Sequence, residues 1–327
     1  MKRILSLFLI VAAGFSCETE LDPNTRISSI PLVYGLFNDA DSVFYIRLGR
    51  TFQTDTNIQK FEIPTDSLIW PNAQITLERW FQGKFVEKET FIEVPNVKRD
   101  SGFFPSSPCQ IFILEKGKGN SDYVYSGISE DLRLIIDLPC KPIVYSEFFL
   151  ISPVAMATPR NSGNTYNMFD FSVIFKAYSN YTELYVRLHY LNRYADTTTS
   201  EMVSWREFHF HDIVDRGIGK DFEIPLEGIP FYERIGKNIP EDTAVFNRKF
   251  EYAEIIINCL DENVYRYNES QRTIPSDQAG RPFTNVVNGM GIVGSRYNRT
   301  ITILFDHRSM VELCSGEYTK HLKFVDW

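Results

Sequence analysis

Residues 75–94 read Ile-Thr-Leu-Glu-Arg-Trp-Phe-Gln-Gly-Lys-Phe-Val-Glu-Lys-Glu-Thr-Phe-Ile-Glu-Val. From residue 75 to residue 80, the side chains Ile, Leu and Arg alternate with Thr, Glu and Trp. The step Gln82-Gly83 suits a tight turn, and a similar alternation continues from Lys84 to Val94. A period of two residues is that of a β-strand with two different faces, and glycine is a common turn residue between paired strands. The stretch therefore predicts a β-hairpin.

Runs of the same kind occur throughout the first half of the chain. Polar or glycine-bearing segments separate them, for example residues 38–42, Asn-Asp-Ala-Asp-Ser. Short strands at such spacing, joined by turns, are typical of an antiparallel β-sandwich. The predicted strands span residues 31–36, 43–48, 109–114, 132–138 and 143–151.

A polar segment with proline and glycine at residues 158–164 predicts a domain boundary near residue 155. Beyond it, strands are expected at residues 168–177, 183–190, 204–211 and 250–258, and short helices at residues 230–236 and 260–271. The predicted fold class is all-β, with two antiparallel β-sandwich (Ig-like) domains at residues 30–155 and 156–327. The short helices are insertions in the second domain.

The N-terminus has the order of a bacterial lipoprotein signal. A basic start at Lys2-Arg3 precedes an apolar run over residues 4–13, and small residues lead to Cys17. Such a signal is cleaved, and a cysteine directly after the cleavage site can carry the lipid anchor. We expect a signal peptide at residues 1–16, lipidation of Cys17 and a flexible tether at residues 17–29. An ordinary secretory signal is the alternative, because Gly14 stands where an aliphatic residue is usual.

Three acidic residues, Glu18, Glu20 and Asp22, follow Cys17 closely. A similar acidic tract in lipoproteins of Bacteroidota acts as a surface-export signal, whereas the simpler interpretation is a solvated, disordered tether; both remain open. The whole chain has 34 basic and 42 acidic side chains, a formal net charge of −8. A nucleic-acid partner is therefore not expected, because phosphate backbones require basic surfaces.

Four cysteines follow Cys17, namely Cys109, Cys140, Cys259 and Cys314. An exported protein meets oxidising conditions, so one hypothesis pairs Cys109 with Cys140 and Cys259 with Cys314, one disulfide in each half. The alternative hypothesis is that the four are free thiols, some of them buried. Their spacing fits no CxxC metal or redox motif, so no metal and no cofactor are expected.

Residues 289–294 spell GxGxxG, the pattern of a dinucleotide-binding loop. That loop belongs to a unit of parallel strands and a helix, whereas strand-like residues 300–305 follow here and only a short stretch of chain remains. We therefore expect no nucleotide site, and interpret the glycines as a turn or bulge before a terminal strand.

Three polar groups are candidate metal sites. His209 and His211 project from one face of a predicted strand with Asp212 beside them, Asp306 precedes His307, and residues 38–42 carry oxygen ligands. None has the further ligands that a metal site requires, so an exposed strand face, a turn after a strand and a hairpin turn are the preferred interpretations. Catalytic motifs such as GxSxG and HExxH are missing from the sequence.

Aromatic residues make up 14% of the chain, with 26 Phe and 17 Tyr. Flat rings stack on sugars, but β-sheets also use aromatic side chains for packing. The adjacent rings of Phe231 and Tyr232 follow Pro230, and they are the preferred candidate for an exposed aromatic pair.

Several segments together resemble a family of Bacteroidota outer-membrane lipoproteins, the domain-of-unknown-function family 4249. The resemblance covers most of the mature chain. It depends on the lipoprotein signal, the strand pair at residues 31–37 and 43–48, the Asp100-Ser101-Gly102-Phe103 step, and residues 285–294 with their late glycines.

The resemblance implies a lipoprotein often encoded near TonB-dependent receptors, without an established activity or assigned catalytic residues. We expect a lipid-anchored protein of the outer membrane, at the cell surface or on the periplasmic face, that is not an enzyme and binds a ligand or a TonB-dependent receptor. Two alternatives are an enzyme that processes surface polysaccharide or peptide, and a structural or adhesive lipoprotein.

Overall fold

The computed structural model describes residues 29–51, 68–97, 109–116, 131–215, 217–272 and 283–326. The predicted signal peptide, Cys17 and the acidic residues Glu18, Glu20 and Asp22 lie outside the described residues, as does the Asp100–Phe103 step. Strands dominate the described ranges, so the predicted all-β class is confirmed. The α-helices within these ranges are short: α2 (Ile229–Asn238), α3 (Glu262–Arg272) and α4 (His307–Ser315).

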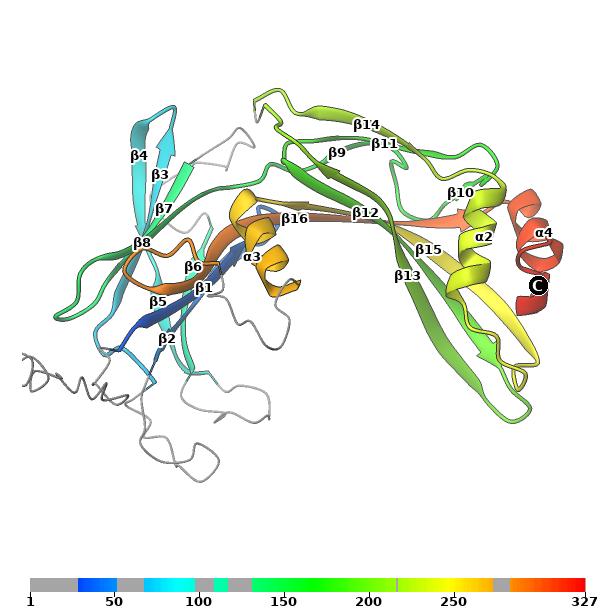
Figure 1. Cartoon of the computed structure of the whole chain (residues 1–327), viewed down its shortest axis with the longest axis horizontal. Helices are drawn as coiled ribbons and strands as arrows, with labels where there is room; N and C mark the ends of the chain where they lie inside the picture. Colours follow the sequence, from blue (N-terminus) through cyan, green and yellow to red (C-terminus); the bar gives the residue numbers. More distant parts are fainter. Residues whose placement is uncertain are drawn as a thin grey trace, which may run out of the picture.

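A single ten-stranded sheet extends through both halves of the molecule (Figure 1). Its main path runs in the order β13-β12-β15-β16-β1-β2-β6-β5, while β10 pairs with β16 and β17 pairs with β15. The strands are β1 (Pro31–Phe37), β2 (Val43–Arg50), β5 (Ile92–Val97), β6 (Cys109–Glu115), β10 (Asn164–Tyr166), β12 (Tyr181–Arg193), β13 (Thr198–His211), β15 (Asn247–Leu260), β16 (Met290–Phe305) and β17 (Phe324–Val325).

Two smaller sheets accompany the large one. The four-stranded sheet has the order β4-β3-β7-β8, and the three-stranded sheet has the order β14-β11-β9. Their strands are β3 (Gln74–Phe81), β4 (Lys84–Thr90), β7 (Asp131–Asp137), β8 (Val144–Phe149), β9 (Ala155–Thr158), β11 (Ser172–Ala177) and β14 (Lys220–Pro225).

The hairpin predicted from residues 75–94 is formed by β3 and β4. Gln82 and Gly83 both have positive φ, 49° and 73°, and Phe81 pairs with Lys84 across them. A two-residue loop with two positive φ values has the twist that paired strands require. The second arm is shorter than predicted, because β4 ends at Thr90 and Ile92 begins β5 in the ten-stranded sheet. The apolar run thus passes from one layer of the sandwich to the other at the buried Phe91.

Two hydrophobic cores lie on the same face of the long strand β16. Val293 belongs to the first core, which β3, β7 and β8 help to form, and Ile303 belongs to the second core with β11 and α2. These two residues are an even number of positions apart, so their side chains leave the same side of the strand. The adjacent residues Phe148 and Phe149 at the end of β8 divide between the two cores.

The expected division into residues 30–155 and 156–327 differs from this arrangement. Val286 and Val293 pack in the first core although they come late in the chain, and β1 pairs with β16 in parallel. An entirely antiparallel organisation is therefore wrong, because β16 returns to the first half before it continues into the second. One sheet joins both cores, as the long orange strand in Figure 1 shows.

Candidate functional site

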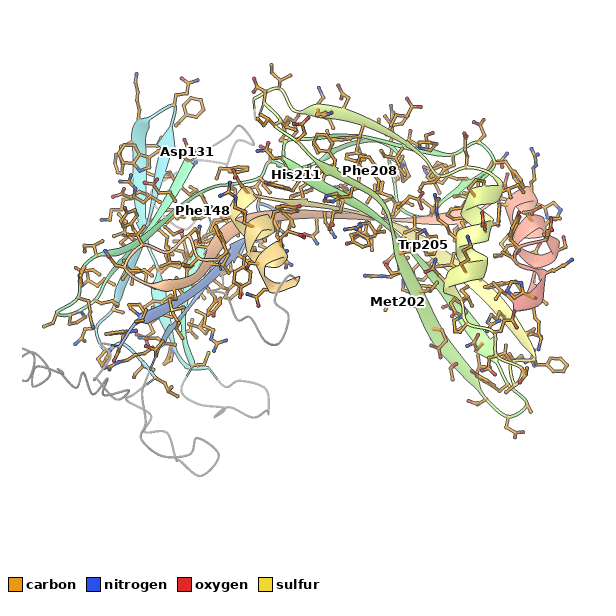
Figure 2. The ribbon with its side chains drawn as sticks, in the orientation of Figure 1. Asp131, Phe148, Met202, Trp205, Phe208 and His211 are labelled. Carbon is orange, nitrogen blue, oxygen red and sulfur yellow. The ribbon has the colours of Figure 1, made fainter. Side chains whose placement is uncertain are left out.

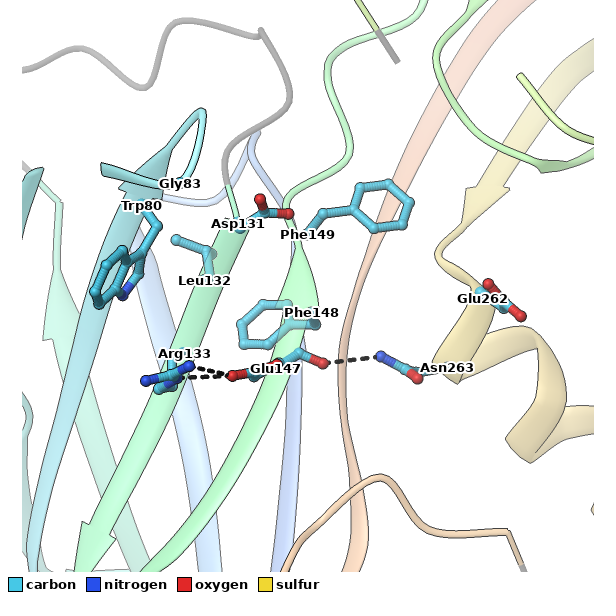
Figure 3. Close-up of a pocket in the computed structure, with 10 residues that line it drawn as sticks. All are labelled: Trp80, Gly83, Asp131, Leu132, Arg133, Glu147, Phe148, Phe149, Glu262 and Asn263. Atoms are coloured by element: carbon cyan, nitrogen blue, oxygen red, sulfur yellow. Dashed lines mark hydrogen bonds and ion pairs between the residues drawn. The ribbon is translucent and has the colours of Figure 1, made fainter. Parts of the chain in front are cut away.

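A hollow of about 460 Å³ lies where the four-stranded sheet meets the beginning of α3 (Figure 3). Its walls come from β3 and its turn, from β7 and β8, and from the first turn of α3. Asp131 and Phe148 of this site lie in the first half of the molecule, away from Trp205 and Met202 (Figure 2). The lining residues are Trp80, Gly83, Asp131, Leu132, Arg133, Glu147, Phe148, Phe149, Glu262 and Asn263.

An ion pair between Arg133 and Glu147 lines the hollow. The two residues face each other directly on the paired strands β7 and β8, with Arg133 Nε 2.8 Å from Glu147 Oε1. Opposite charges at such cross-strand positions stabilise a sheet. The guanidinium also lies over the ring of Trp80, with Cζ 5.5 Å from the ring centroid. Two interactions therefore hold the arginine side chain in place.

The helix α3 closes the hollow from the second half. Asn263 Nδ2 donates a hydrogen bond of 3.1 Å to the backbone oxygen of Glu147. The buried carboxylate of Asp261 sets the start of the helix, because it accepts hydrogen bonds from Val264 N at 2.8 Å and Ser295 N at 3.1 Å. A helix start fixed by a carboxylate is stable, since the first N–H groups of a helix otherwise lack partners.

The lining combines carboxylates, one guanidinium, one amide and aromatic walls. Glu147 is paired with Arg133, and Glu262 with Arg266 one helical turn further along. The ten lining residues include no His, Cys, Ser, Thr or Lys. Such a set of hydrogen-bonding groups beside apolar rings is typical of a site that orients a polar ligand. The ion pair and the side-chain amide were not identified as a site from the sequence, because their proximity depends on strand register and on the packing of α3.

His209 and His211 project from the same face of β13, as their spacing predicts. His211 stacks on Tyr181 at 4.4 Å between ring centroids and lies 5.0 Å from Tyr265 of α3, while His209 Nδ1 is 3.6 Å from Glu183 Oε1. Across the described ranges, no three His, Cys, Asp or Glu side chains converge as a metal site requires. The two imidazoles pack against the aromatic side of α3.

Gly289 lies directly before β16, beside the turn at Asn288 that the sequence predicts, whereas Gly291 and Gly294 lie inside the strand. Gly291 has φ of +119°, and a Cβ there would lie 1.9 Å from the backbone oxygen of Val33 on the parallel strand β1. A Cβ on Gly294 would lie 2.6 Å from Val264 and 2.7 Å from the Asp261 carboxylate. These glycines permit close approach of β1 and α3 to the strand, a structural role for the GxGxxG pattern.

The remaining polar groups have structural partners. Asp39 contacts the ammonium group of Lys116, with Nζ 2.5 Å from its backbone oxygen and 3.2 Å from Oδ1, and Asn38 Oδ1 accepts a 3.1 Å hydrogen bond from Ala40 N. The predicted hairpin turn is confirmed, because these residues join β1 to β2. Asp306 caps α4 through a 2.8 Å bond from Ser309 N, so a helix follows the strand where a turn was expected.

The prediction of an exposed aromatic pair is wrong. Phe231 is 1% exposed and Tyr232 is 0% exposed, because both lie on the face of α2 that packs into the second core. Tyr232 Oη donates a 3.1 Å hydrogen bond to Ser309 O, and burial raises the pKa of the phenol. The proline before the rings begins a helix, whose periodicity directs positions 231, 232 and 235 inward.

The hypothesis of two disulfides is also wrong for this structure, in which Cys109, Cys140, Cys259 and Cys314 are free. Cys259 pairs with Tyr297 in register on β16, whereas Cys314 lies on α4, which begins after the far end of that strand. Tyr297 and Phe305 are eight strand steps apart, a distance of about 26 Å. Cys259 and Cys314 thus belong to different elements, and no disulfide joins them.

Comparisons with known proteins assign no family. No family model matches the chain, and no curated protein matches it. Two solved structures show only a distant likeness. The first, DIP-gamma IG1+IG2, has 10% sequence identity and a TM-score of 0.17, over 85% of this chain and 98% of that chain. The second, Bacteroides uniformis beta-glucuronidase 2 covalently bound to cyclophellitol-6-carboxylate aziridine, has 8% identity and a TM-score of 0.11, over 71% of this chain and 26% of that chain. Within the described ranges, no helix is long and apolar enough to cross a membrane.

Proposed function

We propose that this protein is a lipid-anchored binding protein of the outer membrane, not an enzyme, which holds a hydroxyl-rich ligand such as an oligosaccharide in the hollow beside α3. Its role would be that of an accessory protein to a TonB-dependent uptake system. The observation that carries the proposal is the ion pair of Arg133 and Glu147, in which the guanidinium also lies over the ring of Trp80.

The composition of the hollow supports a hydroxyl-rich ligand. Carboxylates of Asp131, Glu147 and Glu262 supply acceptors, Arg133 supplies donors, and the rings of Trp80 and Phe148 supply apolar walls. A sugar has hydroxyl groups around its edge and apolar faces, so it matches a site that alternates such groups.

The position of the hollow supports a role in binding. Residues from β7 and β8 form one side, and Glu262 and Asn263 at the start of α3 form the other side. Binding pockets commonly form where separate packed units meet. The lipoprotein signal and the family resemblance support location at the outer membrane beside a TonB-dependent receptor.

The test measures glycan binding by the purified mature chain. Isothermal titration against oligosaccharides recovered from the cell surface or the growth medium should give saturable binding, and Trp80→Ala and Arg133→Ala should weaken it at least about tenfold, because each removes a wall or the donor of the site. Phe246→Ala, an exposed aromatic of the second half, should leave binding unchanged.

Two results would overturn the proposal. Release of reducing sugar from the same glycans by the wild-type chain, abolished by Glu262→Gln, would make the hollow a hydrolytic site. Binding that survives both Trp80→Ala and Arg133→Ala would place the ligand elsewhere. Co-purification of the full lipoprotein from detergent-solubilised membranes tests the partner, since a TonB-dependent receptor should be retained with it.

A further inference from the structure

The ten-stranded sheet has an apolar outer face in its first half. Here "outer face" means the side of β5, β6, β2 and β1 opposite the first core. Tyr45 and Ile92 on this side are 58% and 71% exposed. Sheets that have one solvated face normally carry polar side chains there, and a strand that is apolar on both faces is normally covered on both. The apolar side chains of the outer face are Leu32, Tyr34, Leu36, Val43, Tyr45, Ile92, Val94, Ile111 and Ile113.

Strand register makes these side chains one continuous surface. Tyr45 pairs with Ile113 on β6, and Ile113 pairs with Ile92 on β5, so one apolar row crosses three strands. Side chains directly opposite on neighbouring strands have their Cβ atoms about 5 Å apart. The adjacent row consists of Tyr34, Arg47, Ile111 and Val94.

The charges around this face are arranged unequally. Arg47 lies within it, with its guanidinium 6.0 Å from the ring of Tyr34. Arg50 and Lys141 belong instead to the core side of the sheet, where they lie 4.8 and 5.6 Å from the ring of the buried Trp70. The acidic Glu115 lies at the end of the strands remote from Pro31, paired with Val43. The outer face therefore carries a basic side chain within it and an acidic one at the end away from the N-terminal segment.

That segment is short. Eleven residues, 18–28, separate Cys17 from Ser29, and Pro31 already begins β1, one of the strands of the outer face. Twelve chain steps reach at most about 42 Å. A lipid on Cys17 would therefore keep the outer face close to a bilayer, at a high effective concentration.

We propose that the outer face of β5, β6, β2 and β1 docks on the lipid surface of the membrane that holds the Cys17 anchor. This inference rests on the anchoring part of the proposed function and is independent of the hollow. Tyrosines suit the interface between headgroups and acyl chains, isoleucines and leucines enter its apolar side, and Arg47 complements anionic phosphate groups. Contiguous exposed apolar surface of this kind marks an interaction site in soluble proteins.

The test uses the mature chain without lipid, in which Cys17→Ser removes only the acceptor of the anchor; every described contact of the fold comes from residue 29 onward. Co-sedimentation with vesicles of phosphatidylethanolamine and phosphatidylglycerol should show partitioning. Ile92→Glu and Tyr45→Glu should reduce it about tenfold each, because a carboxylate replaces the inserted group. Ile213→Glu, a matched control at a residue 89% exposed in the second half, should have no effect.

Each variant should fold as the wild-type chain does, because the substituted residues are exposed. Circular dichroism and the melting temperature check this. Partitioning that is absent from the wild-type chain, or that is equal in the outer-face variants and the control, would overturn the proposal. Concentration-dependent dimerisation abolished by Ile92→Glu, without vesicle binding, would also overturn it and assign the face to a second copy of the chain. A wild-type chain that binds vesicles but no glycan would separate failure of the hollow from failure of this inference.

Discussion

Ser295 and Phe149 are joined by a hydrogen bond at the seam between the two cores, in which Ser295 Oγ donates to Phe149 O at 2.6 Å. The same hydroxyl accepts a 3.1 Å hydrogen bond from Ile151 N. Ser295 is fully buried and lies on β16 between Val293 of the first core and Tyr297 of the second. A single side chain thus connects residues 149–151, which follow β8 toward the second core, to β16, the strand that both cores share.

Ser295→Ala should therefore destabilise the whole molecule. The substitution leaves a buried carbonyl and a buried N–H without this partner, a cost of about 2 kcal/mol. Urea unfolding followed by circular dichroism and by tryptophan fluorescence should report the loss, with Ser200→Ala on the exposed edge strand β13 as the control. Equal stability of the two variants would contradict the structural role of the hydroxyl.

Gly291→Ala should break the parallel pairing of β1 with β16. The added Cβ would lie 1.9 Å from Val33 O, and the φ of +119° is unfavourable for alanine. We expect a loss of more than about 3 kcal/mol in the free energy of unfolding. Gly217→Ala is the matched control, because a Cβ there meets only Asp215 Oδ1 at 3.4 Å. A thermal melt in which both variants behave alike would contradict the register of β1 and β16.

Phe231→Ala tests the correction of the aromatic pair. Removal of a ring that is 1% exposed creates a cavity in the second core and should cost about 4 kcal/mol. Phe246→Ala removes a ring that is 76% exposed and should change stability by less than about 0.5 kcal/mol. The comparison is made by denaturant unfolding, and a small effect at both positions would show that residue 231 is at the surface.

The four cysteines should differ in their reaction with iodoacetamide. Burial raises the pKa of the Cys259 thiol to about 12, so at pH 8 its thiolate fraction is far below that of an ordinary thiol, and access is also blocked. Cys140 is exposed and should be alkylated first. Mass spectrometry of the native protein over time measures the order, and a protein without reactive thiols before reduction would contradict the free state of the cysteines.

Local patterns in the sequence predicted much of the secondary structure. The hairpin at Gln82-Gly83 and the helix α3 follow from periodicity and turn chemistry, which act between residues close in the chain. The parallel pairing of β1 with β16 could not be predicted in this way, because it joins residues about 260 positions apart. Helix α4 was not predicted although Asp306 is a favourable N-cap, because the residues after the strand-like run 300–305 were interpreted as a turn.

The candidate site shows the same limit. Arg133 and Glu147 are ordinary charged strand residues until strand register places them opposite each other. The contribution of Asn263 depends on the packing of α3 against the sheet, which Gly294 permits by lacking a Cβ. The helix around Phe231 follows from the sequence, but the burial of this ring depends on which face of α2 packs into the second core.

The central claim, that the protein works while tethered through Cys17, is tested most directly by labelling cells with tritiated palmitate and fractionating their membranes. Wild-type protein should carry the label and sediment with the outer membrane, and Cys17→Ala should lose both the label and the membrane association that depends on acylation. Cys140→Ala, which removes an exposed cysteine of the folded part, should keep both. A Cys17→Ala protein that is still labelled would contradict the account.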